Sequence, residues 1–384
     1  MTALRRAMLS GLWLLAGCTG ASRPAAVAGE PTYRRSEVTG IVAAIRQIDT
    51  TEGIDRLEAV EIGGIRQWLS IRGRHRSNPM LLFVHGGPGS PTMPSAWAFQ
   101  APWEEFFTVV QWDQRGAGKT ATGTDRPAVT PTITEERMIA DGEEVVRYLL
   151  ATFDQPKLFL LGHSWGTVIG TNIAHRHPEW LYAYIGMGQV ANSLASERLG
   201  YAFALREARA RRDSTAVREL EALEPYPDPD GKVPVAKILT QRKWVIAYGG
   251  LTWKRSDFNY DLDAAKLSPE YTAADLDAPE DLGSLTQLID ALGSIRYDET
   301  MLEFGCPVFV LAGKYDYETA SATAKSWFDR IRAPRKGFVW FEHSAHMIPF
   351  EEPGKLLVHL VQDVRPLAGP IPDPAPSFPA PEPR

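Results

Sequence analysis

Short apolar runs recur along the chain, and their unbroken character is typical of strands that are covered on both faces. The six strongest runs lie at residues 80–84, 107–112, 158–161, 181–187, 307–313 and 337–341. Helical periodicity separates several of them, as from Thr134 to Phe153, where acids are frequent early and apolar residues form one face. Strands that alternate with helices pair in parallel through right-handed crossovers. The pattern therefore predicts an α/β domain whose mostly parallel sheet is flanked by helices.

Two regions depart from this rhythm. Between residues 38 and 71 apolar and polar positions alternate loosely, and Gly63-Gly64 predicts the turn of a hairpin. Between residues 191 and 303 the apolar and polar positions follow a helical pattern, and no segment has a convincing strand pattern. This indicates a helical cap inserted between two strands of the sheet. The expected divisions are a core at 33–190 and 304–365, a cap at 191–303 and a Pro-rich, disordered tail at 366–384.

Composition is that of a soluble globular protein. The chain has 384 residues, and 44% of them are hydrophobic, which is enough to build a sizeable core. The formal net charge of -6 is mildly acidic. No nucleic-acid partner is therefore expected.

The N-terminus indicates an export signal. Arg5 and Arg6 precede an apolar run at residues 7–17, which is too short to span a bilayer comfortably and ends in Leu-Ala-Gly before Cys18. This arrangement resembles a bacterial lipoprotein signal, which implies loss of residues 1–17, acylation of Cys18 and a tether at 18–32. The domain is then expected in the bacterial cell envelope, held to a membrane by its lipid and lying in the periplasm or outside the cell. A plain secretory signal and a short retained anchor are the alternatives.

The centre of the sequence is the stretch Gly162-His163-Ser164-Trp165-Gly166, between a predicted strand and a predicted helix. This is the G-x-S-x-G pattern in the strand–turn–helix setting that it requires. The two glycines remove side chains that would collide as strand and helix close on each other. The strained turn projects the hydroxyl of Ser164, which we interpret as a nucleophile.

A serine nucleophile needs a base, and the base needs an acid that orients it. Asp316 follows the run at 307–313, and His346 follows the run at 337–341. They occur in the order Ser, acid, His that this kind of sheet requires, at strand carboxyl ends where such sites are built. His343 is an alternative base, whereas Asp329 is expected on a helix surface.

A glycine-rich loop, His85-Gly86-Gly87-Pro88-Gly89, directly follows the run at 80–84. Backbone N–H groups in such a loop can approach a substrate oxygen closely. We predict an oxyanion hole formed by the backbone N–H groups of Gly87 and Trp165, the residue after the nucleophile. His85 is expected to form structural hydrogen bonds.

Two other motifs only partly match known ligand-binding patterns. The segment Gly116 to Thr120 lacks the first glycine of a phosphate-binding loop, because that position is Asp113. His175, His177 and Glu179 have no third ligand at zinc-protease spacing. No cofactor and no metal are therefore expected, and Cys306 is predicted to be a buried structural thiol.

The motifs HGGPG at 85–89, DQRGAGKT at 113–120 and GHSWGT at 162–167, with Asp316 and His346, resemble the α/β-hydrolase fold. They are most similar to the prolyl aminopeptidase, or proline iminopeptidase, family of serine peptidases. The resemblance implies release of an N-terminal residue, often proline, through an acyl-enzyme. It also implies that acidic groups bind the substrate's free amine, for which Glu318 is the candidate. The cap lacks the Trp-Glu pair expected from the family, because Val245 follows Trp244 and Lys254 follows Trp253.

The sequence thus predicts a serine hydrolase acting on a small peptide or acyl substrate. The lead hypothesis is an aminopeptidase, and the first alternative is an esterase or amidase with the same machinery under a different cap. A lipoprotein that uses the scaffold only to bind a ligand is a further alternative.

Overall fold

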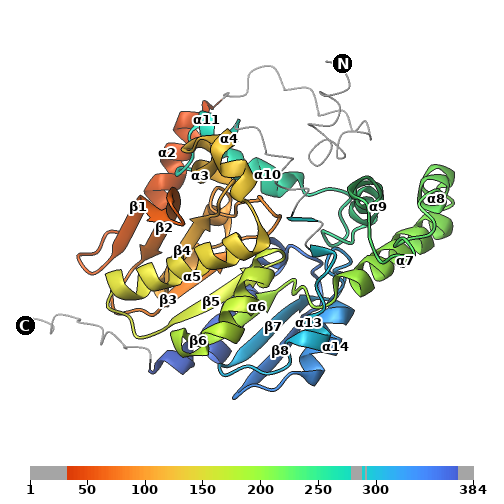
Figure 1. Cartoon of the computed structure of the whole chain (residues 1–384). Coiled ribbons are helices and arrows are strands. Elements are labelled where there is room, and N and C mark those ends of the chain that lie inside the picture. The colour runs from red at the N-terminus through yellow and green to blue at the C-terminus, as the bar shows by residue number, and fades with distance from the viewer. Residues whose placement is uncertain (1–32, 278–287, 290–291, 371–384) are drawn as a thin grey trace, which may run out of the picture.

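The computed structural model describes residues 33–277, 288–289 and 292–370. Eight strands form one sheet in the order β1-β2-β4-β3-β5-β6-β7-β8 (Figure 1). Their bounds are β1 (Ile54–Ile62), β2 (Ile65–Gly73), β3 (Met80–Val84), β4 (Thr108–Asp113), β5 (Leu158–His163), β6 (Leu181–Met187), β7 (Val308–Gly313) and β8 (Lys336–Phe341). Strand β2 is antiparallel to β1 and β4, and all other neighbours are parallel. The predicted mostly parallel sheet and the predicted hairpin are confirmed.

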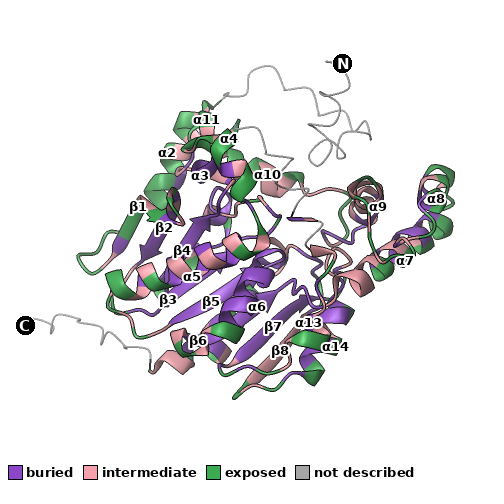
Figure 2. Cartoon of the chain, viewed as in Figure 1, coloured by how far each residue is buried: buried purple, intermediate pink, exposed green. Residues whose placement is uncertain are grey.

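Apolar side chains on both faces explain why the central strands read as unbroken runs. In β3, Leu82 and Val84 pack into one hydrophobic cluster and Leu81 and Phe83 into another, because successive residues of a strand point to opposite faces. Figure 2 shows the central strands buried along their length. The sheet is therefore the middle layer of three.

The two outer layers come from different parts of the chain. One face is covered by α5 (Glu135–Thr152), α6 (Gly166–Arg176) and α14 (Ser321–Arg330). The other face is covered by the 96–107 segment together with α15 (Ile348–Glu351) and α16 (Pro353–His359). Thr134 caps α5, because its side chain accepts a 3.2 Å hydrogen bond from the backbone N–H of Arg137.

The segment between β6 and β7 is built from helices. They are α7 (Ser193–Arg211), α8 (Ser214–Glu221), α9 (Val235–Ala247), α10 (Asn259–Lys266), α11 (Ala273–Leu276) and α13 (Tyr297–Thr300). Helices α7, α8 and α9 enclose a small hydrophobic cluster of their own. Helices α7 and α8 are separated at Arg212, which takes a left-handed conformation with φ of +56°. Residues 278–287, 290 and 291 of this segment lie outside the described residues.

Helix α2 (Arg35–Ile45) precedes the hairpin, in a stretch for which the sequence predicts only loose alternation. The helical signal there is the spacing of Val38, Ile41, Val42 and Ile45. The remaining short helical turns are α3 (Gly118–Thr122), α4 (Arg126–Val129), 3₁₀ turns at 96–98, 101–105, 130–132, 178–180 and 365–368, and a π-helical turn at 360–364. Cys306 is buried, as expected.

The predicted signal at 1–17, Cys18, the tether at 18–32 and most of the predicted tail lie outside the described residues. Among the residues that the structure describes, no helix is long and apolar enough to cross a membrane.

A buried polar cluster joins the cap segment to the sheet domain. One carboxylate oxygen of Asp113, at the end of β4, accepts a hydrogen bond from the hydroxyl of Tyr271 and a 2.8 Å hydrogen bond from the backbone N–H of Lys119. The ammonium of Lys119 forms a 2.7 Å ion pair with Asp275 in α11. Burial raises the pKa of Asp113 to about 7, although both of these hydrogen bonds lower it.

This pKa makes the stability of the protein dependent on pH. The folded state keeps the proton of Asp113 up to about pH 7, whereas the unfolded chain loses it near pH ~4. The free energy of unfolding should therefore fall, by on the order of a few kcal/mol, as pH rises between these values and then level off. In Asp113→Asn this component of the slope should disappear in urea unfolding measured from pH 4 to 8.

Asp263→Asn provides the control, because Asp263 is exposed and pairs only with Lys266 at 2.8 Å among the described residues. An Asp113→Asn protein with the same pH slope as the control would contradict the assignment of the slope to Asp113.

Candidate active site

Ser164 lies at a strained turn between β5 and α6. Its φ is +53°, a left-handed conformation that costs a non-glycine residue energy. A Cβ on Gly162 would lie 2.6 Å from the carbonyl oxygen of Gly166, and a Cβ on Gly166 would collide with the carbonyl oxygen of Val84. The backbone N–H of Ser164 donates a 3.0 Å hydrogen bond to the carbonyl of Met187 in β6, which fixes the turn.

Asp316 and His346 meet across the ends of β7 and β8. Nδ1 of His346 lies 2.8 Å from Oδ2 of Asp316, and both side chains are buried. The other oxygen of Asp316 accepts 2.9 Å hydrogen bonds from the backbone N–H groups of Glu318 and Thr319. The hydroxyl of Thr319 donates to Oδ2 at 3.1 Å. The carboxylate is thus held from three sides and keeps the imidazole in one orientation.

The environment of His346 favours its protonated form. Burial lowers the pKa of this imidazole, but the charge of Asp316 and its hydrogen bond outweigh burial, and Glu318 adds to their effect. The net result is a pKa raised above the ordinary value of 6.5. A cation that forms on His346 would therefore be stabilised by its partner.

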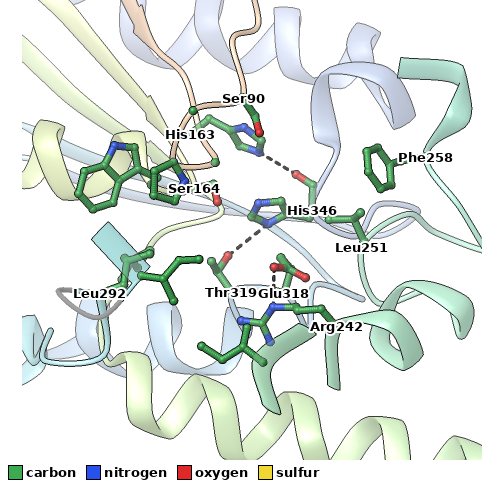
Figure 3. Close-up of a pocket in the computed structure, with 18 of the residues that line it drawn as sticks. Ser90, His163, Ser164, Arg242, Leu251, Phe258, Leu292, Glu318, Thr319 and His346 are labelled. Carbon is green, nitrogen blue, oxygen red and sulfur yellow. Dashed lines mark hydrogen bonds and ion pairs between the residues drawn. The ribbon is translucent and has the colours of Figure 1, made fainter. Parts of the chain in front are cut away.

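Ser164 and His346 line the same cavity, whose volume is about 1480 Å³. In Figure 3 the hydroxyl of Ser164 points toward the His346 ring, and Thr319 and Glu318 lie beyond that ring. The structure thus brings the predicted nucleophile, base and acid together at one edge of the sheet. It does so because all three follow the carboxyl ends of parallel strands.

His163 was not assigned a role from the sequence, yet it contacts His346 directly. The two rings lie 4.7 Å apart between centroids, and Nε2 of His163 donates a 3.1 Å hydrogen bond to the carbonyl of His346. Burial lowers the pKa of His163 to about 3, so this ring is neutral at physiological pH. In the sequence, only its position immediately before Ser164 indicated that His163 lies at the active site.

The glycine loop after β3 passes over the nucleophile. Gly87, with φ of +108°, and Trp165 both line the cavity, as the predicted oxyanion hole requires. A Cβ on Gly86 would lie 2.9 Å from Cβ of Ser164, so the loop approaches as closely as its glycines permit. The backbone N–H groups of the loop can therefore come near a carbonyl bound at Ser164.

His85 and Gln114 hold this loop in place. The backbone N–H of Gln114 donates to Nε2 of His85 at 3.3 Å, and its side-chain amide donates to the His85 carbonyl at 2.9 Å. The same amide's oxygen accepts a 3.2 Å hydrogen bond from the indole of Trp165. Burial lowers the pKa of His85 to about 4, which keeps it neutral. These contacts are structural and leave His85 outside the acid–base chemistry.

Glu318 lines the cavity but is not a free carboxylate. Its Oε1 accepts a 2.6 Å hydrogen bond from Nε of Arg242 in α9, and Arg242 also pairs with Glu197 in α7. Two carboxylates therefore share one guanidinium in the cavity wall. No local pattern marks Arg242, because its partners Glu318 and Glu197 are distant in the chain.

The alternative residues lie elsewhere. The ring of His343 packs on Trp253 at 4.9 Å, and His343 is not among the residues that line the cavity. Asp329 pairs with Lys325 at 2.6 Å on the exposed side of α14. His177 stacks on Trp180 at 3.8 Å, and among the described residues no group of three or more His, Cys, Asp and Glu could hold a metal ion.

The pKa of His346 can be measured by NMR titration of the histidine rings. We expect a value above 6.5 for His346 and no titration of His163 above pH ~4. In Asp316→Asn the charge is lost and burial remains, so the pKa of His346 should fall below 6.5. Asp329→Asn should leave it unchanged. A pKa that is equal in both variants would show that Asp316 does not act on His346.

Known proteins share this architecture. Residues 79–215 match the sequence model of the α/β-hydrolase fold. A probable aminopeptidase of Bacillus subtilis, YbaC, is 28% identical over 80% of this chain and 95% of its own length. A proline iminopeptidase of Saccharolobus solfataricus is 24% identical over 81% and 91%, respectively.

Solved structures agree with this assignment. The proline iminopeptidase-related protein of Thermus thermophilus has a TM-score of 0.60 at 20% identity, covering 82% of this chain and 98% of its own. The proline iminopeptidase of Mycobacterium smegmatis has a TM-score of 0.56 at 18% identity, covering 82% and 99%. The chain therefore has the α/β-hydrolase fold, and the relatives that it resembles are named aminopeptidase and proline iminopeptidase.

Proposed function

We propose that this protein is a serine hydrolase in which Ser164, His346 and Asp316 form the catalytic triad. The observation that supports the proposal most is the buried 2.8 Å pair of His346 and Asp316, with Ser164 at its strained turn in the same cavity. Ordinary surface serines and histidines do not combine these features.

In the first half of the reaction, Oγ of Ser164 attacks the substrate carbonyl while Nε2 of His346 takes the hydroxyl proton. The negative charge that develops on the carbonyl oxygen is stabilised by the backbone N–H groups of Gly87 and Trp165. Asp316 orients the imidazole through Nδ1 and stabilises the cation that forms.

The leaving group departs when the intermediate collapses and His346 donates its proton to that group. This leaves an acyl group on Ser164. Water then attacks the acyl carbon, His346 accepts a proton from the water, and the second collapse returns that proton to Oγ of Ser164. The acid product is released, and the enzyme regains its starting state.

The favoured substrate is a short peptide with a free N-terminus. Support comes from the relatives' names and from the carboxylates of Glu318 and Glu197 in the cavity wall. Oε2 of Glu318 is buried and has no hydrogen-bond partner among the described residues. An ammonium group could satisfy this oxygen through a charge-assisted hydrogen bond, provided that Arg242 shifts to uncover it.

An esterase or amidase is the second candidate. Arg242 already pairs with both acidic groups. The cavity of about 1480 Å³ exceeds the ~300–1,000 Å³ that is common for small-molecule sites, and its walls carry many apolar side chains, including Leu251, Phe258 and Leu292 (Figure 3). Both observations fit a bulky acyl substrate that lacks a free amine. A purely ligand-binding role remains the third candidate.

We also propose that Cys18 carries a lipid anchor, which would hold the domain at a membrane of the bacterial cell envelope. The support is the sequence alone, with Arg5, Arg6, the apolar run and the small residues before Cys18.

Ser164→Ala should reduce turnover by at least ~10³-fold while the unfolding midpoint stays close to that of the wild type. A fluorophosphonate probe should label the wild-type protein at Ser164 and leave the variant unlabelled. The measurements are kcat/KM and mass spectrometry of the labelled peptide. Unchanged turnover, or labelling at another residue, would refute the proposed nucleophile.

The substrate class follows from kcat/KM for prolyl and alanyl p-nitroanilides, their N-blocked forms and short-chain p-nitrophenyl esters. For an aminopeptidase, Glu318→Gln should lower kcat/KM for the free-amine substrates by about 10- to 100-fold, the loss of one charged hydrogen bond. Ester turnover, which needs no free amine, should change much less, because Glu318 acts on it only through its small effect on the pKa of His346. Glu342→Gln is the matched control, because Glu342 is exposed and forms an ion pair with Lys314.

Strong turnover of esters, with no dependence on a free amine and no effect of Glu318→Gln, would favour the esterase. Absence of turnover and of probe labelling would favour the ligand-binding role.

A further inference from the structure

Helix α2 presents apolar side chains to the outside of the domain. Tyr33, Ile41 and Ile45 are 67%, 54% and 76% exposed. They are three of the seven large apolar residues that are exposed among the described residues, and they lie within thirteen consecutive positions. The others are scattered through the chain. Exposed apolar residues that gather on one surface are typical of interaction sites.

Only part of the apolar face of α2 is buried against the rest of the domain. Val38, Ile41, Val42 and Ile45 follow helical spacing and therefore share one face. Val42 at the inner edge of this face is buried, whereas Ile41 and Ile45 at the outer edge are exposed. The helix thus packs against the domain with one edge of its apolar stripe and leaves the other edge uncovered.

The exposed edge belongs to a firmly held element. Arg35 donates hydrogen bonds to the carbonyls of Lys266, Ser268 and Tyr271 at 2.8, 3.1 and 2.7 Å. At the other end of the helix Arg46 pairs with Glu270 at 2.5 Å. Figure 1 shows α2 beside α11 at the margin of the sheet domain. The apolar edge is therefore presented in a fixed direction relative to the cavity wall, to which Lys266 and Tyr271 contribute.

We propose that the exposed edge of α2, formed by Ile41 and Ile45, rests on the surface of a lipid bilayer together with Tyr33, which lies just before the helix. The inference is independent of the catalytic proposal and rests on the proposed anchor at Cys18. Fourteen residues separate Cys18 from Tyr33, so even a fully extended tether reaches only about 50 Å. Within that distance the effective concentration of the bilayer at α2 is high, and a small apolar contact suffices to orient the domain.

The charges around the edge fit a bilayer contact that is apolar rather than electrostatic. The basic residues Arg34 and Lys266 are exposed, and so are the acidic residues Glu37 and Asp263. The positive and negative charges of these four residues cancel. A second copy of the chain is a poor occupant, because a stable protein interface takes about 20–30 residues on each side. Helix α2 has eleven residues, and its exposed apolar edge contains few of them.

The test uses the full-length, acylated protein in vesicles of phosphatidylethanolamine and phosphatidylglycerol. In a Cys306→Ala background, a nitrobenzoxadiazole label is placed through Ile41→Cys or Ile45→Cys. Leu199→Cys and Val358→Cys are the matched controls, because both side chains are exposed and lie in α7 and α16. Lipids with a doxyl group in the acyl chain should quench the labels at 41 and 45 strongly and leave those at 199 and 358 unchanged.

The anchor and the docking face are tested separately. Mass spectrometry and vesicle flotation report the anchor, and a chain that is neither acylated nor bound to vesicles would overturn the proposal together with its premise. A chain that floats with vesicles while the labels at 41 and 45 remain unquenched keeps the anchor and overturns the docking face. Labels at 41 that are already shielded without vesicles, or that cross-link two copies, would show that protein covers α2 and would equally overturn it. Probe labelling of Ser164 is unaffected by any of these outcomes.

Discussion

The start of α6 lies so close to the end of β3 that only glycine fits at the contact. A methyl group on Gly166 would collide with the carbonyl oxygen of Val84, and one on Gly86 would crowd Ser164. The helix can therefore sit directly on the strand, and the turn that joins β5 to α6 is forced into the left-handed conformation of Ser164. This contact therefore places the nucleophile under the glycine loop, where both line the cavity.

Much of the fold could be predicted because the central strands have no solvent face. Unbroken apolar runs marked β3, β5 and β7, and the helix between β4 and β5 was marked by its early acidic residues and its apolar stripe. Ser164, Asp316 and His346 could be located because each follows a strand, and strand ends in a parallel sheet converge. That these three residues would lie close together could be predicted from their positions directly after parallel strands.

What the sequence could not show depends on contacts between distant segments. Arg242 meets Glu318 across 76 positions and Tyr271 meets Asp113 across 158, and neither pair leaves a local pattern. Helix α2 was missed for a different reason. Half of its apolar stripe lies in solvent, so the stripe resembled the alternation of an exposed strand more than the face of a buried helix. In the cap, polar and charged pairs replace much of the apolar patterning on which sequence analysis relies.

The contact between His163 and His346 has a consequence for how such a domain can vary. The residue before the nucleophile holds the backbone of the base, although the two come from halves of the chain that the cap separates. The N-terminal and C-terminal parts of the core therefore cannot be exchanged independently with those of a relative. In a chimera joined within the cap, residue 163 and residue 346 would come from different parents. Residue 163 would still have to bond the backbone of residue 346 for the imidazole of the base to be placed correctly.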